Sequence, residues 1–283
     1  MRPHLPRFIL IFLGAQAAVL PALAVDMSKP DVRSRSALVV DRTDGSILYS
    51  QLADDVAPIA SITKLMTALV VLDANQPLDE TLEVTQADRI HGRGAASRIQ
   101  VGAKLTRGEL LRLALMSSEN RAAHVLGRNY PGGEVAAVRA MNRKALALGM
   151  TRSHFVDPAG LSGENVASAA DLAKLVVAAS KSPVIRSYST TERYSVTLGR
   201  SSVEFHNTNL LVRDPKWVID VQKTGYISEA GQCLVLQARI IGRDTVIVLL
   251  NSFGKYTRVA DARRIRQWLE HRPPTAVARV AAP

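Results

Sequence analysis

The sequence places a serine three residues before a lysine, in Ser61-Ile62-Thr63-Lys64. Residues at this spacing share one face of a helix, with about 5–6 Å between their Cβ atoms. A lysine amine at that distance can take the proton of a serine hydroxyl, which is a weak nucleophile until a base does so. A helix that begins at this point also directs unpaired N–H groups and positive potential toward a developing oxyanion. The tetrapeptide therefore indicates a nucleophilic serine paired with a lysine base.

Two more short motifs follow Ser61 in the chain. They are Ser118-Glu119-Asn120, in a helical stretch, and Lys223-Thr224-Gly225, at the head of a β-rich region. S-x-x-K, S-x-N and K-T-G in this order form the three-part signature of serine penicillin-recognising enzymes. A second S-x-x-K, Ser252-Phe253-Gly254-Lys255, follows a β run and contains a glycine, so we interpret Ser252 as a strand-end turn. The ordered set of three motifs carries the prediction, because each motif is common by itself.

The sequence around the motifs resembles the low-molecular-mass penicillin-binding proteins of the D-alanyl-D-alanine carboxypeptidase/endopeptidase family. The resemblance runs from about Ser36 to Leu269, and no motif position departs from the family's pattern. In length and in the segment from Leu115 to Ala123, the chain is most similar to the short endopeptidase branch. The segments that carry the resemblance are 60–68, 115–123, 157–161 and 223–226.

The resemblance implies a set of catalytic roles. Ser61 would be the acylated nucleophile, Lys64 its general base, and Ser118 would relay a proton to the leaving amine. The backbone N–H groups of Ser61 and Tyr226 would form the oxyanion hole, where fixed donors need no reorganisation during the reaction. A second cation disfavours the charged form of a lysine. We therefore expect Lys223 to keep the amine of Lys64 available as a base.

The same resemblance implies the substrate-binding residues. Asn120 would bind the amide backbone of the substrate, Lys223 would supply positive charge, and Thr224 would donate a hydrogen bond to a substrate carboxylate. Gly225 and Tyr226 would complete the binding strand. Taken singly, each of these side chains is also compatible with an ordinary role at a helix end or on the surface. The ordered set argues against that alternative.

Neither a metal nor a cofactor is expected. The six histidines show no H-x-x-x-H or H-E-x-x-H spacing, which helical zinc sites use. The single cysteine, Cys233, excludes a disulfide within the chain and a cysteine-based zinc site. It stands in the apolar run Cys233-Leu234-Val235-Leu236, so we interpret it as a small buried hydrophobic residue.

The first residues predict export to the periplasm. Residues 1–24 combine a basic start at Arg2 and Arg7, an apolar run from Phe8 to Leu20, and an A-x-A cleavage site at Ala22-Leu23-Ala24. This is the pattern of a secretory signal peptide. The apolar run is too short for a comfortable membrane span, although an uncleaved anchor stays open as an alternative.

Cleavage removes two of the positive charges and leaves a net charge of +9 from the +11 of the full chain. Such a surplus favours anionic partners, and export argues against nucleic acid.

The spacing of apolar residues predicts where helices and strands lie. Helices are expected where apolar residues recur at helical spacing, and strands where short apolar runs end at glycine or polar turns. The expected helices span about 61–75, 107–126, 135–148, 169–180 and 258–271. The expected strands are 36–40 and 47–50, joined by a turn at Asp44-Gly45, and runs near 198, 203, 218–221, 233–238 and 245–251.

Strands at both ends of the chain, with helices between them, favour one sheet built from both ends. We therefore predict an α+β fold, in which an antiparallel sheet from both chain ends is flanked by helices and stands beside a mainly helical lobe. The resemblance implies the same architecture, that of DD-peptidases and β-lactamases. Residues 25–272 would form this catalytic domain, and residues 273–283 a disordered tail.

The expected activity is that of a serine DD-endopeptidase. It would cut D-Ala–diaminopimelate cross-links in peptidoglycan, and penicillins would inhibit it covalently. Three alternatives stay open: a D-alanyl-D-alanine carboxypeptidase on pentapeptide stems, a β-lactamase, and a non-catalytic cell-wall binding protein. A β-lactamase needs a carboxylate that activates water, and Glu164-Asn165 lies in a plausible loop without that family's spacing.

Membrane attachment is expected to be loose at most. Longer carboxypeptidases of this family carry an added β domain and a C-terminal amphipathic anchor, and too few residues follow Gly225 for that appendage. The basic helix expected at residues 258–271 is better explained by a solvated face over a packed apolar stripe than by membrane binding.

Overall fold

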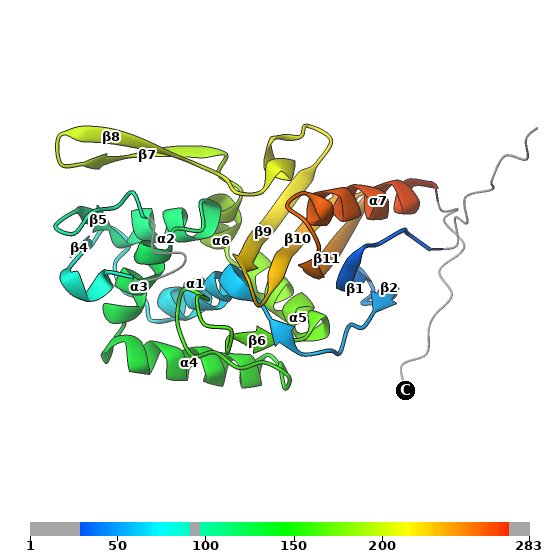
Figure 1. The fold of residues 1–283 in the computed structure, drawn as a ribbon, viewed down its shortest axis with the longest axis horizontal. Coiled ribbons are helices and arrows are strands. Elements are labelled where there is room, and N and C mark those ends of the chain that lie inside the picture. Colours follow the sequence, from blue (N-terminus) through cyan, green and yellow to red (C-terminus); the bar gives the residue numbers. More distant parts are fainter. Residues whose placement is uncertain (1–28, 91–96, 272–283) are drawn as a thin grey trace, which may run out of the picture.

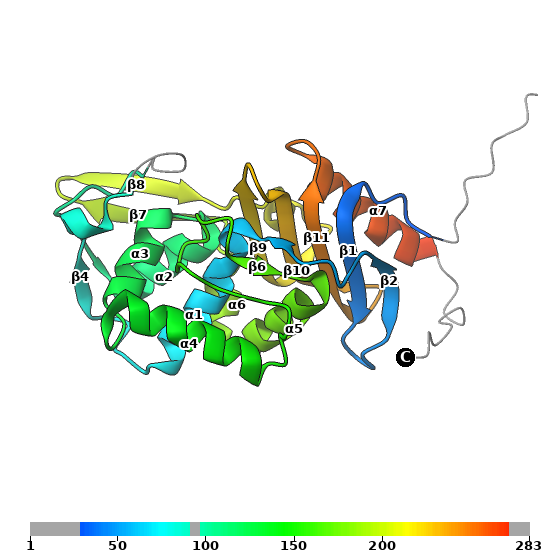
Figure 2. The ribbon, with the colours of Figure 1, turned by 60° about the horizontal axis from the view of Figure 1, so that its bottom comes forward.

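The computed structural model describes residues 29–90 and 97–271 (Figures 1 and 2). A five-stranded sheet stands at one end of the molecule and a mainly helical lobe at the other. The predicted signal peptide (1–24) and the predicted disordered tail (273–283) lie outside the described residues.

The sheet combines both ends of the described chain, as the sequence predicts. Its strands are β1 (Ser34–Asp41), β2 (Ile47–Gln51), β9 (Val218–Ile227), β10 (Gly231–Ile240) and β11 (Arg243–Ser252). All neighbours are antiparallel, in the order β2-β1-β11-β10-β9. β1 pairs with β11 in a register that sets Val39 opposite Ile247. β9 is therefore an edge strand, and it faces the helical lobe (Figure 1).

Alternate residues of the sheet belong to two separate apolar clusters. Along β1, Ala37 and Val39 pack on one side and Leu38 on the other, as the two-residue period of a strand requires. Helix α7 (Thr257–His271) covers the first side, and helix α5 (Ala169–Ser180) covers the second. Because both faces are covered, β10 and β11 consist of nearly continuous apolar runs.

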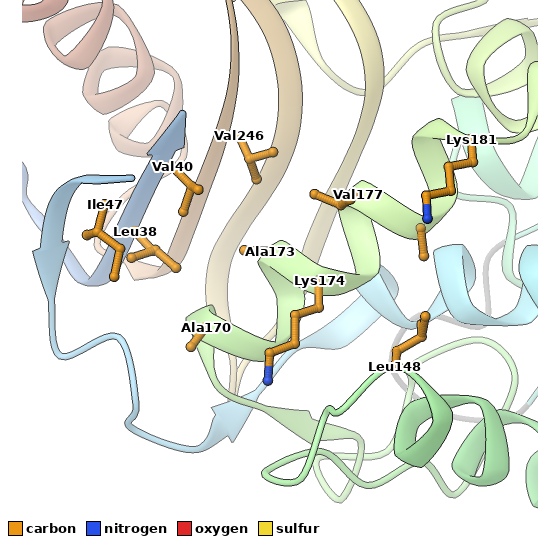
Figure 3. A pocket seen from close by; sticks show the side chains of 11 residues that line it. Leu38, Val40, Ile47, Leu148, Ala170, Ala173, Lys174, Val177, Lys181 and Val246 are labelled. Carbon is orange, nitrogen blue, oxygen red and sulfur yellow. The ribbon is translucent and has the colours of Figure 1, made fainter. Parts of the chain in front are cut away.

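A hollow of about 430 Å³ lies where α5 meets the hairpin of β1 and β2 (Figure 3). Apolar side chains such as Leu38, Val40 and Val177 form most of its lining, together with Lys174 and Lys181. The residues that the sequence predicts to act on a substrate do not line it. The hollow is therefore a packing feature separate from the predicted site.

The middle of the chain forms the helical lobe around one central helix. Its helices are α1 (Thr63–Asp73), α2 (Arg107–Met116), α3 (Asn120–Arg128), α4 (Gly133–Ala147) and α6 (Pro183–Ser189). The short strands pair as β3 (Ala57–Pro58) with β6 (Val166–Ala167), β4 (Thr81–Glu83) with β5 (Lys104–Thr106), and β7 (Arg193–Leu198) with β8 (Ser201–His206). The described residues also form three 3-10 turns: η1 (Ala60–Ile62), η2 (Gln86–Asp88) and η3 (Leu210–Arg213).

Helix α1 occupies the centre of the lobe. Every residue from Thr63 to Val71 is buried, so the helix has only a weak amphipathic pattern.

The single helix predicted over residues 107–126 is wrong, because the structure has two helices there. α2 ends at Met116 and α3 begins at Asn120. Between them Ser118 has a φ of 59°, in the left-handed region, and the side chain of Glu119 caps α3 by accepting from the N–H of Arg121. A non-glycine residue in this region costs about 1–2 kcal/mol, and such residues concentrate at functional sites. The apolar periodicity continues across the break, so it cannot reveal the turn.

Asp261 of α7 ties the start of β1 to the end of the described chain. Its buried carboxylate accepts hydrogen bonds from the backbone N–H groups of Arg33 (3.1 Å) and Ser34 (2.7 Å), and from the Ser34 hydroxyl. Arg264 pairs with the same carboxylate. The Ser34 hydroxyl also contacts that of Ser252 at 2.6 Å, which joins β1 to β11. These bonds hold together the sheet whose edge is β9.

Replacing Asp261 by alanine is expected to destabilise the protein strongly. Two backbone N–H groups and one hydroxyl lose a buried acceptor, and each unsatisfied buried donor costs about 1–3 kcal/mol. We expect the free energy of unfolding, measured by urea denaturation, to fall by about 3 kcal/mol. Glu270→Ala on the same helix is the control, since it removes only a surface partner of Arg266, and its effect should stay within about 0.5 kcal/mol. Equal effects of the two substitutions would contradict the account.

Candidate active site

Three parts of the chain meet at the edge of the sheet that faces the helical lobe. They are η1 with the start of α1, the connection between α2 and α3, and the end of β9 (Figure 2). Each part carries one of the three motifs, so the fold brings the predicted residues together. These residues are Ser61, Lys64, Ser118, Asn120, Lys223, Thr224, Gly225 and Tyr226.

The amine of Lys64 is the centre of the hydrogen-bond network. The side chain has no exposed surface. Its Nζ lies 2.7 Å from the Ser61 Oγ, 2.7 Å from the Asn120 Oδ1 and 2.5 Å from the carbonyl oxygen of Ala159. Three acceptors therefore surround the three hydrogens that the amine carries when protonated.

Burial lowers the pKa of Lys64 to about 7, because a desolvated amine disfavours its charged form. The carboxylates of Asp157 and Glu119 act in the opposite direction. Burial is therefore the main cause of the lowered pKa of Lys64, and the expectation that the charge of Lys223 lowers it is wrong. Lys223 is also fully buried, and its pKa is lowered well below the usual range by burial and then by the charges of Lys64 and Arg258.

The surroundings of Lys64 direct its lone pair at Ser61. A neutral amine has two N–H donors and one lone pair. When its two hydrogens point at the carbonyl oxygens of Asn120 and Ala159, the lone pair faces the Ser61 hydroxyl. Such an amine can remove the hydroxyl proton and make the oxygen nucleophilic.

The turn that carries Ser61 is held by close backbone packing. Ala60, just before it, has a φ of 48°, and its carbonyl oxygen accepts from the Thr63 hydroxyl at 2.7 Å. Gly160 packs directly on this carbonyl: a Cβ at Gly160 would lie 2.0 Å from the Ala60 oxygen. Gly160 itself has a φ of 75°, which favours glycine. The position of the nucleophile thus depends on the absence of a side chain from a neighbouring loop.

That neighbouring loop is organised by one carboxylate. Asp157 accepts hydrogen bonds from the backbone N–H groups of Ala159 (2.7 Å), Gly160 (2.5 Å) and Ser162 (2.9 Å), and from the side-chain amide of Asn165 (2.5 Å). These bonds fix the Ala159 carbonyl that accepts from the Lys64 amine. The sequence analysis used this segment only as part of the resemblance and missed its positioning role. One signal in the sequence could have revealed this role. Asp157 stands shortly before a glycine and several polar residues, which is typical of a loop whose backbone N–H groups bind a carboxylate.

The second buried lysine faces Ser118. The Lys223 amine donates to the Ser118 Oγ at 2.8 Å and to the Thr224 carbonyl oxygen at 2.8 Å. Since the amine donates to it, the Ser118 oxygen keeps its own proton free for another acceptor. The Thr224 hydroxyl lies 2.6 Å from the hydroxyl of Thr208, which follows β8. Sequence reasoning missed Thr208, because no motif includes it.

Gly225 and Arg258 complete the strand edge next to Ser61. A Cβ at Gly225 would lie 2.8 Å from the Ile59 carbonyl oxygen and 3.2 Å from the Ser61 nitrogen, so only glycine lets β9 approach this closely. Arg258 of α7 donates to the Gly225 carbonyl oxygen at 2.7 Å. It adds a guanidinium to the two buried lysine amines of the site. The sequence analysis treated it only as part of a basic amphipathic helix, and nothing in the local pattern distinguished it from its arginine neighbours.

The described residues contain no cluster of three or more His, Cys, Asp or Glu side chains that could hold a metal ion. Cys233 is buried, and burial raises the pKa of its thiol to about 11. A thiol with that pKa stays protonated at neutral pH and is a poor nucleophile.

The fold and the site together are those of the serine penicillin-recognising enzymes, and comparison with known proteins narrows this class. A family model described as D-alanyl-D-alanine carboxypeptidase, peptidase S11, matches residues 24–254. The D-alanyl-D-alanine endopeptidase of Pseudomonas aeruginosa is 45% identical, over 98% of this chain and 92% of its own. That of Escherichia coli is also 45% identical, over 90% of this chain and 83% of its own.

Among solved structures, the Streptomyces K15 DD-transpeptidase is 28% identical with a TM-score of 0.79, covering 85% of this chain and 98% of that one. Penicillin-binding protein D2 of Listeria monocytogenes, in its cefotaxime-bound form, is 28% identical with a TM-score of 0.74, covering 84% and 97%.

The chain belongs to the peptidase S11 family of D-alanyl-D-alanine peptidases. It is a serine-type hydrolase, and both the resemblance and the α+β fold expected from the sequence are confirmed.

Gly160→Ala is expected to lower the rate of penicillin acylation about 100-fold, because a shift of roughly 1 Å in a reacting group has an effect of that size. The added Cβ must displace the Ala60 carbonyl next to the nucleophile. Gly45→Ala is the matched control: Gly45 has a φ of 76° but no atom within 4 Å of the added Cβ. It carries the same backbone strain without touching the site, so its acylation rate should stay at the wild-type value. Equal rates for the two variants would show that Gly160 does not position Ser61.

The rate of acylation is expected to rise with pH and to level off above about 7. Below the pKa of Lys64 the amine is protonated and cannot act as a base, so the rate falls about tenfold for each further unit of pH. Measurement of the acylation rate with a fluorescent penicillin between about pH 5 and pH 9 checks this. Lys64→Arg keeps its proton at every accessible pH and should remain unlabelled throughout. A flat profile in the wild type would rule out Lys64 as the base.

Proposed function

We propose that this chain is a DD-endopeptidase that cuts D-Ala–diaminopimelate cross-links in peptidoglycan through an acyl-enzyme on Ser61. One contact carries the proposal: the buried amine of Lys64 lies 2.7 Å from the Ser61 hydroxyl. The choice of substrate is supported by the relatives from P. aeruginosa and E. coli, which are named D-alanyl-D-alanine endopeptidases.

Acylation begins when the neutral amine of Lys64 takes the proton of Ser61. The serine oxygen attacks the carbonyl carbon of the D-Ala residue, and the resulting oxyanion is stabilised by the backbone N–H groups of Ser61 and Tyr226. The carbon–nitrogen bond then breaks. Ser118, whose oxygen accepts from the Lys223 amine, passes its proton to the leaving amine and takes up the proton that Lys64 removed from Ser61, so that Lys64 returns to its neutral form. Water releases the acyl group in a second step, with Lys64 again as the base. β-Lactams acylate the same serine and inhibit the enzyme.

Substrate binding depends on the positive end of the strand edge. A terminal D-Ala and a cross-linking diaminopimelate residue each carry a carboxylate beside the scissile amide. Thr224, the buried amine of Lys223 and the guanidinium of Arg258 lie at the end of β9, where such a carboxylate would bind. Asn120, already bonded to Lys64, presents its amide to the substrate backbone.

A D-alanyl-D-alanine carboxypeptidase is the second candidate, because the matching family model carries that description. The two activities share the serine chemistry and differ only in what lies beyond the scissile bond. The structure gives less support to a β-lactamase. A β-lactamase needs a carboxylate that activates the deacylating water, and Glu164 is the residue that the sequence offers for this role. Glu164 is exposed, and the acids whose charges act on Lys64 are instead Asp157 and Glu119.

We also propose that residues 1–24 are a cleaved signal peptide and that residues 25–272 form the catalytic domain. The mature enzyme would then work in the periplasm on cross-linked peptidoglycan. In the part of the chain that the structure describes, no helix is both long and apolar enough to cross a bilayer. Loose attraction to an anionic polymer or membrane surface is compatible with the net charge of the chain.

The test compares two substrates with the purified mature enzyme. A cross-linked muropeptide dimer should be converted to monomers, while monomeric pentapeptide should release little D-Ala. Chromatography of both digests separates the outcomes, and Ser61→Ala serves as the inactive control. Efficient release of D-Ala with an untouched dimer would make the enzyme a carboxypeptidase.

A further inference from the structure

Three aromatic rings are exposed in the described part of the chain. They are Tyr226 (60% exposed), Phe253 (91%) and Tyr256 (60%). The other aromatic rings among residues 29–90 and 97–271 are buried or half-buried. A single exposed apolar side chain is ordinary, whereas a group of them marks an interaction surface.

The register of the sheet places the first two rings at one end of β9 and β11, the two strands on either side of β10. Tyr226 of β9 lies opposite Gln232 of β10, and Gln232 lies opposite Ser252 of β11. Tyr226 and Ser252 are therefore two strand spacings apart, about 10 Å. Phe253 follows Ser252 directly, at the point where β11 ends (Figure 1).

The loop after β11 is held beside the end of β9. It contains Phe253 and Tyr256 and is closed by a hydrogen bond from the Thr257 hydroxyl to the Phe253 carbonyl. Just after it, Arg258 donates to the Gly225 carbonyl oxygen at 2.7 Å. The loop and the strand end thus form one continuous surface.

This surface begins at the catalytic serine. A Cβ on Gly225, the residue before Tyr226, would lie 3.2 Å from the Ser61 nitrogen. A peptide stem of about four residues, fully extended, spans roughly 13 Å. This length exceeds the spacing of about 10 Å between Tyr226 and Ser252. A stem peptide held at Ser61 is therefore long enough to bring its sugar backbone to the loop that follows Ser252.

We propose that Tyr226, Phe253 and Tyr256 form an aromatic platform that binds the glycan strand of peptidoglycan beside the catalytic site. The proposal rests on the proposed function, because a glycan strand is brought to this place by a stem peptide that is bound at Ser61. The platform would favour insoluble, cross-linked peptidoglycan over free stem peptides.

The chemistry of the platform suits a sugar chain. One face of a pyranose ring consists of C–H bonds, and it packs on the flat face of an aromatic ring. Tyrosine combines such a face with a hydroxyl that hydrogen-bonds in water. Lys255, whose amine lies 5.4 Å from the centre of the Tyr256 ring, supplies a cation for the carboxylates of the attached peptides.

The experiment uses the mature protein with Phe253→Ala and Tyr256→Ala combined. Val218→Ala is the matched control, because Val218 is 61% exposed and stands at the opposite end of β9. Binding is measured by cosedimentation with purified sacculi, with and without peptide-free glycan strands as competitor. We expect the double variant to bind sacculi about tenfold more weakly than the wild type or Val218→Ala. We also expect glycan strands to compete for the wild type and for Val218→Ala, but not for the double variant.

Two further measurements separate this inference from the proposed function. Penicillin acylation and cleavage of a soluble, sugar-free peptide dimer should be the same in the double variant and the wild type. A wild type that fails to cleave the dimer would disprove the proposed function, while cosedimentation would still report on glycan binding. Unchanged binding and cleavage of sacculi by the folded double variant would overturn the platform. The platform would also be overturned if anionic lipid vesicles, and not glycan strands, competed with sacculi for binding to the wild type.

Discussion

The buried amine of Lys64 is the constraint on which the rest of the site depends. Removing a lysine from water costs free energy unless its charge is matched or its proton is lost. The protein does both: three oxygen acceptors lie 2.5–2.7 Å from the amine, and burial lowers its pKa to about 7.

Two of these acceptors are positioned by the loop that contains Asp157 and Gly160. Asp157 fixes the loop that presents the Ala159 carbonyl, and Gly160 leaves room for the turn that carries Ser61. The reactivity of the serine follows from this environment.

The side chains of the site come from several elements of the fold, and no single element carries them all. α1 carries Lys64 through the centre of the lobe, the first residue of α3 contributes Asn120, and the edge strand β9 contributes Lys223. The site therefore exists only where the lobe meets the sheet. The bonds from Asp261 to the start of β1 keep the sheet, and so the position of β9, fixed. Burial maintains the neutral amine of Lys64 beside the nucleophile. The charge of Lys64 acts in turn on Lys223, whose pKa it lowers further after burial.

Much of this account was predictable from the sequence, since the three motifs and the strands at both chain ends carry their own signals. The helix over Ala169–Ser180 was predicted to the residue, because Ser168 caps it and apolar spacing continues to its end. The break at Ser118 was not predictable, since its left-handed backbone is imposed by tertiary packing and the apolar pattern runs across it. Thr208 and Arg258 were missed for a related reason. Their contacts join residues far apart in the chain, and neither residue type nor spacing marks them. The cause of the low pKa of Lys64 was also misjudged, because burial cannot be read from a motif.

The most direct test of the central claim is to locate the covalent adduct of a fluorescent penicillin by peptide mapping. The chain has a second S-x-x-K serine, Ser252, which is buried at the end of β11 and bonded to Ser34. The account predicts one long-lived adduct, on the peptide that contains Ser61, and none in Ser61→Ala. An adduct that persists in Ser61→Ala or maps to Ser252, or rapid turnover of the drug without accumulation, would contradict it.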